Sequence, residues 1–93
     1  MFAIAFDMTV SEMEKLHPKS VRAGYDEIGR TLSRYDFAWI QGSVYHCLNE
    51  DLANLAGALN ALKALPWFPA RVLDIRSFRV EHWSDFTHII KSA

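Results

Sequence analysis

Asp7 is the first residue of the chain whose type and position suggest chemistry. It follows the apolar run FAIAF at residues 2–6 and precedes Met8, so a carboxylate stands at the end of a stretch typical of a buried strand. One interpretation is structural, because Asp at a strand end often accepts backbone N–H bonds, here from residues 8–10. The other is functional, because a carboxylate at a dimer groove can bind a metal ion or act as a general base. The residues alone favour the structural interpretation and keep the functional one as the alternative.

Ser43 and a group of arginines are the other side chains suited to phosphate chemistry. Ser43 lies in a glycine-containing turn without the G-x-S-x-G context of a nucleophile, which favours turn chemistry first and a substrate hydrogen bond second. Three arginines lie near Trp83 in the sequence: Arg71, Arg76 and Arg79. Arginines can bind phosphates and a tryptophan ring can stack on bases. The same arginines also suit the charged border of an edge strand, which protects a sheet from aggregation.

Other kinds of site find little support in the sequence. The four histidines show no pair at zinc-ligand spacing, and the single cysteine, Cys47, rules out an intrachain disulfide and a cysteine-rich zinc site. His46 and Cys47 are adjacent strand residues, so their side chains point to opposite faces and make a poor nucleophile pair. The glycines are scattered and form no phosphate-binding loop, which argues against a nucleotide-cofactor enzyme.

Apolar periodicity indicates the elements that would position these groups. Residues 2–7 alternate with a period of two, with apolar side chains on both faces, so they predict a central strand whose Ala3, Ala5 and Asp7 face is small. A helix is expected over 18–35, with Pro18 in its first turn. A second helix is expected after Asn49 as N-cap, ending before Pro66.

The remaining segments predict strands. Residues 37–48 flank Gln41-Gly42-Ser43 with aromatic and β-branched residues, the pattern of a hairpin. In residues 71–86 the apolar parity switches around Arg76-Ser77, which predicts a bulge or a break into two strands. Ser84 is expected to cap a short closing helix that runs through Ile90.

This order predicts one α+β domain over residues 1–93 with the ferredoxin-like βαββαβ pattern and an extra C-terminal strand or short helix. Both helices would cover one face of an antiparallel sheet and leave the face of Ala3, Ala5 and Asp7 open. A second copy covering that face would explain its small residues, so we expect a homodimer packed through the sheet face.

Charge and hydropathy indicate which partners and which cellular location to expect. Ten Lys and Arg against eleven Asp and Glu give a net charge of −1, which is not the signature of a nucleic-acid-binding protein, so any basic surface must be local. No stretch approaches 18 apolar residues and no secretory signal is apparent at the start. We therefore expect a soluble, cytoplasmic protein without a membrane partner.

Several blocks of the sequence together resemble the virulence-associated protein D (VapD) family. They are AIAFD at 3–7, His17-Pro18, QGSVY at 41–45, NEDLANL at 49–55 and DIRSFRVEHWSDFT at 74–87. These blocks follow one another in order over nearly the whole chain; the segment PWFPAR at 66–71 is the least typical.

The resemblance implies a cytoplasmic bacterial endoribonuclease that acts as a homodimer on single-stranded RNA or mRNA, as the toxin of a toxin–antitoxin pair. The family is also similar in fold to small CRISPR-associated nuclease or adaptor proteins, whose first strand likewise ends in an aspartate at the dimer groove. On that likeness Asp7 is the catalytic carboxylate. The paired Asp7 carboxylates of a homodimer would either hold a divalent cation such as Mg²⁺, or one of them would act as base on the RNA 2′-hydroxyl without a cofactor. Ser43, Arg76 and Arg79 would bind substrate.

Two other functions remain open from the sequence. Some of the related adaptors act as scaffolds, so a nucleic-acid-binding dimer without chemistry is one alternative. A ferredoxin-like regulatory module for a small ligand or protein is the other, and the absence of a basic excess slightly favours it.

Overall fold

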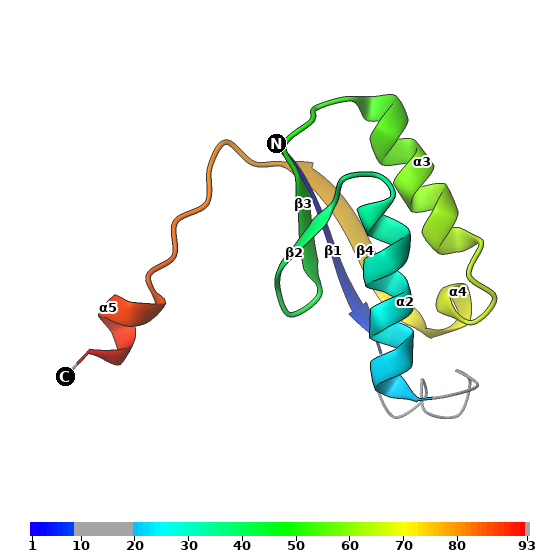
Figure 1. Ribbon diagram of the computed structural model, residues 1–93, viewed down its shortest axis with the longest axis horizontal. Helices are drawn as coiled ribbons and strands as arrows, with labels where there is room; N and C mark the ends of the chain where they lie inside the picture. The colour runs from blue at the N-terminus through cyan, green and yellow to red at the C-terminus, as the bar shows by residue number, and fades with distance from the viewer. Residues whose placement is uncertain (9–19, 93) are drawn as a thin grey trace.

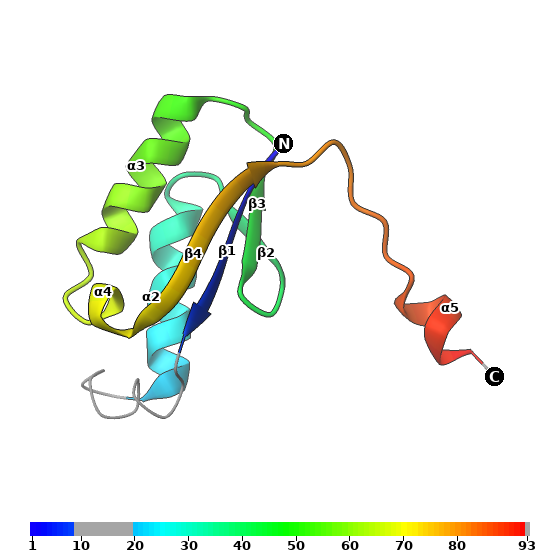
Figure 2. The same cartoon turned by 180° about the vertical axis from the view of Figure 1, so that it is seen from behind.

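The computed structural model describes residues 1–8 and 20–92. In chain order its elements are β1 Phe2–Met8, α2 Val21–Ser33, β2 Ala38–Gln41, β3 Val44–Cys47, α3 Leu52–Lys63, α4 Phe68–Arg71, β4 Val72–Arg79 and α5 Thr87–Lys91. The strands form one antiparallel sheet in the order β2-β3-β1-β4. Helices α2 and α3 cover one face of this sheet (Figure 1), and the view from behind shows no helix over the other face (Figure 2). The expected ferredoxin-like α+β fold is confirmed, with a short helix as the closing element.

The core lies between the sheet and the helices. Ile4 and Phe6 of β1 point to this side and are buried together with side chains from both helices and from the segment before β4. Burying a side chain of this size stabilises the fold by about 1.5–3 kcal/mol. The other members of the core are Ile28, Leu32, Phe37, Tyr45, Cys47, Leu55, Ala58, Leu62, Trp67 and Phe68.

Side-chain caps set where the two long helices begin. The Ser20 hydroxyl accepts a hydrogen bond from the Ala23 N–H at 3.0 Å at the start of α2, while the expected first turn at Pro18 lies outside the described residues. At α3 the N-cap is Asp51, whose carboxylate accepts from the Ala53 N–H at 2.9 Å. The prediction of Asn49 as the cap is wrong, because its side chain accepts from the Asp51 N–H and shapes the turn before the helix.

Strand β4 is continuous where the sequence predicted a bulge or break. Its pairing with β1 runs unbroken from Phe2 opposite Arg79 to Asp7 opposite Asp74, and the irregularity lies beyond that, near Leu73. The expected break at Arg76-Ser77 is therefore wrong. The apolar parity changes because Phe78 stands on the open face of a regular strand, 44% exposed.

The chain leaves the domain after β4. The Val80 N–H donates to the Met1 carbonyl at 2.7 Å, and the following residues extend away from the sheet to α5 (Figure 1). Asp85, not the expected Ser84, accepts from the Thr87 N–H at the start of α5. Within residues 1–8 and 20–92 we find no helix that combines the length and apolar character needed to cross a bilayer.

Candidate active site

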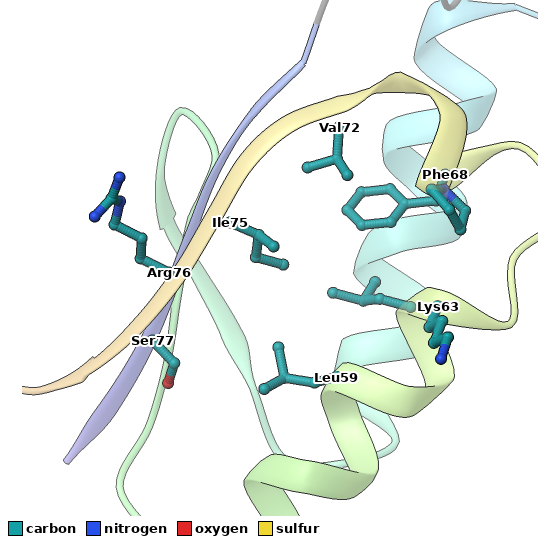
Figure 3. A pocket seen from close by; sticks show the side chains of 9 residues that line it. Leu59, Lys63, Phe68, Val72, Ile75, Arg76 and Ser77 are labelled. Atoms are coloured by element: carbon teal, nitrogen blue, oxygen red, sulfur yellow. The ribbon is translucent and has the colours of Figure 1, made fainter.

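The open face of the sheet carries the polar residues singled out in the sequence. Residues directly opposite each other in an antiparallel pair share a face, and Ala5 and Asp7 of β1 lie opposite Arg76 and Asp74 of β4. Figure 3 shows Arg76 projecting to the side away from the helices, while its neighbour Ile75 points toward them. The predicted placement of Asp7 on the uncovered face is confirmed.

A shallow cavity of about 330 Å³ lies on this face at the end of β1; we call it the Asp7 groove. It brings together three of the candidate site residues from the sequence, Asp7, Ser43 and Arg76. Asp74 also lines it. The described residues that line it are Ala5, Phe6, Asp7, Ser43, Val44, Asp74, Arg76 and Phe78.

Two carboxylates face each other across the floor of the Asp7 groove. Asp7 and Asp74 are directly opposite on adjacent strands, so their Cβ atoms stand about 4.5–5.5 Å apart. Arg76 Nε donates to Asp74 Oδ2 at 3.0 Å, whereas Asp7 makes no ion pair with any described residue. The groove thus combines two negative charges with one positive charge, and like charges placed opposite each other destabilise a sheet.

Ser43 reaches the groove because the β2–β3 hairpin turns beside Asp7. Gly42 adopts φ 47°, the left-handed conformation that glycine tolerates and that the tight turn requires. The Phe6 N–H then donates to the Ser43 carbonyl at 3.1 Å, which holds the turn against β1 one residue before Asp7. The predicted hairpin with its glycine turn is confirmed, and it sets Ser43 at the edge of the site.

Arg79, by contrast, lies away from the Asp7 groove. It pairs with Phe2 at the other end of β1, five strand residues or about 17 Å from the Asp7 position. Its Nε donates to Glu50 Oε2 at 2.8 Å, and the Met1 ammonium donates to the same oxygen at 2.9 Å. Hydrogen bonds from the N-terminal ammonium first and from Arg79 second hold the pKa of Glu50 below its usual value. The structure does not bring Arg79 to the candidate site.

Asp74 is the groove residue that sequence reasoning missed. Its position near the start of the last strand could have identified it. In a ferredoxin-like sheet the first and last strands pair antiparallel, so the start of the last strand lies beside the end of the first. The register of the last strand against the first could not be derived from the alternation of its apolar residues, because that alternation predicted a break in the strand.

The groove suits a hard cation with open coordination positions rather than a closed metal site. Among the described residues no group of three or more His, Cys, Asp or Glu side chains could hold a metal ion. Mg²⁺, however, is commonly bound through one or two carboxylates and completes its shell with waters and substrate phosphates. The Asp7 and Asp74 carboxylates fit that requirement.

A second cavity, of about 350 Å³, lies under the edge of the sheet between α3, α4 and β4. Figure 3 shows Leu59, Phe68, Val72 and Ile75 pointing into it. The described residues that line it are mainly apolar and include no carboxylate, histidine or thiol, so it is a poor candidate for phosphodiester chemistry.

Comparison with curated proteins finds full-length relatives. A protein of Neisseria gonorrhoeae named "Endoribonuclease VapD homolog" is 55% identical over 92 residues, which cover 99% of this chain and all of that protein. "Endoribonuclease VapD" of Haemophilus influenzae is 49% identical with the same coverage, and that of Dichelobacter nodosus is 44% identical over the full length of both chains. A scan against protein-family models returned no match.

Proposed function

This chain belongs to the VapD family, and from that premise we propose that it is an endoribonuclease that cleaves single-stranded RNA or mRNA in the Asp7 groove. The observation that carries the proposal is the convergence of Asp7, Asp74, Arg76 and Ser43 in one open cavity on the bare face of the sheet. Exposed carboxylates that oppose each other cost stability, and such local conflicts concentrate at functional sites.

Each groove residue has a role in this proposal. Asp7, which makes no ion pair with the described residues, acts as the base on the RNA 2′-hydroxyl or on an attacking water. Arg76 uses Nε for Asp74, so its terminal nitrogens stay available to hold a phosphate oxygen. The Ser43 hydroxyl, at the edge of the groove, donates a further hydrogen bond to the phosphate.

A divalent cation such as Mg²⁺ fits the charge of the site. Among the described lining residues, two carboxylates and one guanidinium leave one excess negative charge, which repels an approaching phosphodiester. We propose that Asp7 and Asp74 together hold the cation, which would supply charge neutralisation and activation of the nucleophile. In this metal-dependent route Asp7 would serve as a cation ligand instead of as the base, and Arg76 continues to orient Asp74.

We further propose that two copies pack through the open face as a homodimer. The face contains the small side chain of Ala5, which allows close approach, and the exposed ring of Phe78, which is available for burial; Ala3 is already fully buried within the chain. Symmetry would bring the two Asp7 carboxylates to a shared groove. The dimer would act in the cytoplasm as the toxin of a toxin–antitoxin pair, so its induction alone should arrest growth and co-expression of the antitoxin should relieve the arrest.

Incubation with end-labelled RNA, with and without a chelator, tests the nuclease assignment. Wild-type protein should cleave the RNA and Asp7→Asn should not, because the change keeps the size of the side chain and removes its charge and basicity. Circular dichroism and gel filtration establish that the variant folds like the wild type. RNA that is bound but left intact by the wild-type protein would instead identify a non-catalytic scaffold.

The chemistry of the product ends separates the two routes. If cleavage persists in chelator, attack by the 2′-hydroxyl should leave 2′,3′-cyclic phosphate ends. Products with 5′-phosphate ends would contradict that route and indicate attack by water.

A further inference from the structure

Trp39 forms one wall of a cavity on the other side of the β2–β3 hairpin. The cavity, of about 520 Å³, lies between this hairpin and α2. Trp39 is directly opposite Tyr45, whose partner Ile4 is in the core, so its ring lies on the helix side of the sheet. Nevertheless it is 63% exposed. The lining consists of Tyr25, Asp26, Gly29, Arg30, Ser33, Phe37, Ala38, Trp39, Gly42 and Tyr45.

A hydrogen bond fixes the exposed indole. Trp39 Nε1 donates to the Gly42 carbonyl at 2.8 Å, so the ring is tied to the hairpin turn instead of rotating freely. A surface aromatic ring that is already ordered loses little entropy when a flat ligand stacks on it. The bond also satisfies the indole N–H and leaves the ring faces for contact.

Polar side chains from α2 complete the cavity. Asp26 and Arg30 both line it, one turn apart on the helix, together with the Tyr45 ring. The pKa of the Tyr45 hydroxyl is raised, first by burial and then by the charges of Tyr25 and Asp26, so this hydroxyl stands within the field of the Asp26 carboxylate. A carboxylate in the lining disfavours a phosphate there and accepts hydrogen bonds from the N–H groups of a base edge.

The hairpin turn joins this cavity to the Asp7 groove. Gly42 lines the Trp39 cavity, and the next residue, Ser43, lines the groove. A strand of RNA with its phosphate at Ser43 would therefore reach the Trp39 cavity by passing around the turn.

Resting on the nuclease function proposed above, we propose that the Trp39 cavity is a nucleobase subsite. A base adjoining the scissile phosphate stacks on Trp39, and its edge faces Asp26. Aromatic rings bind single-stranded RNA in this way, because every base offers a flat face. The subsite would supply affinity that the weakly charged surface of this protein lacks.

Binding of a short fluorescent RNA to catalytically silent protein tests the subsite without relying on cleavage. In an Asp7→Asn background, Trp39→Leu should weaken binding about 10-fold or more, because it removes the stacking face. Trp39→Phe keeps an aromatic face and should stay within about 3-fold of the parent. Leu48→Ala, at an exposed apolar position in neither cavity, serves as the control and should bind like the parent.

Abasic substitutions along the RNA identify what the ring contacts. One or two positions should weaken binding to the parent protein and have no effect on Trp39→Leu. Equal binding by parent and Trp39→Leu would overturn the subsite, and so would equal losses in the Leu and Phe variants. A change in oligomeric state with unchanged RNA binding would make this surface a protein interface instead. Loss of cleavage without these binding changes would count against the subsite and leave the nuclease proposal intact.

Discussion

The two ends of the β1–β4 ladder carry two charge clusters of opposite character. At one end Glu50 accepts from both the Met1 ammonium and Arg79, so one negative charge meets two positive charges. At the other end Asp7 and Asp74 face each other, and Arg76 pairs with Asp74, so two negative charges meet one positive charge among the described residues. The first cluster joins the chain start to the end of β4 and to the segment before α3.

This difference indicates that the charged groups at the Glu50 end stabilise the fold, whereas those at the Asp7 end are available for chemistry. At the Glu50 end each group has a partner, and the cluster connects segments far apart in sequence. At the Asp7 end a carboxylate that has no ion pair among the described residues lies opposite another carboxylate, an arrangement that lowers stability. We therefore expect substitutions at the Asp7 end to change activity and those at the Glu50 end to change stability.

Neutralising one carboxylate at each end gives the largest contrast. Asp74→Asn should lower cleavage about 10- to 100-fold, because it removes a proposed cation ligand and the anchor of Arg76. The matched change Glu50→Gln should leave the specific activity of folded protein within about 2-fold. Initial rates on labelled RNA over a Mg²⁺ series measure both. Equal losses in the two variants would remove the distinction between the ends.

In the proposed homodimer, a mixed dimer that carries one altered chain tests whether the two Asp7 residues form one site. If they share one scissile phosphate or one cation, a dimer with one wild-type and one Asp7→Asn chain should lose about 10-fold or more, because groups that act as a unit are strongly non-additive. Two independent sites would leave about half the activity. A doubly tagged heterodimer, purified away from both homodimers, can be assayed directly; half activity would contradict the shared site.

Arginines at the two ends provide a smaller but closely matched test. Arg76→Gln should raise KM about 5-fold, the equivalent of one phosphate hydrogen bond of roughly 1 kcal/mol. Arg79→Gln changes the same side-chain type at the Glu50 end and should leave KM unaltered. Steady-state kinetics at fixed salt measure both. A KM effect from Arg79→Gln alone would return that residue to substrate binding, as the sequence first suggested.

The arginine pair also shows what the sequence can and cannot predict. Local patterns identified the central strand, the hairpin with its Gly42 turn and the uncovered face, because period-two alternation and turn chemistry act over a few residues. The separation of Arg76 from Arg79 depends on strand register and on a contact with Glu50, 29 residues away in sequence. Asp74 was missed for the same reason: its partner Asp7 is determined by register, not by spacing.

The smallest expected effect is the pH dependence of stability at the Glu50 end. The pKa of Glu50 is lowered in the folded state, so its contribution is present above the unfolded pKa and is lost as pH falls through the folded value. At pH 7 Glu50→Gln should therefore melt slightly below the wild type, and the gap should close in acid. Asp7→Asn should instead raise stability at pH 7, because it relieves repulsion from Asp74. Melting curves followed by circular dichroism at pH 7 and at pH 3 provide the comparison. If both variants melted below the wild type at pH 7, Asp7 would be a structural residue, and the contrast between the two ends would fail.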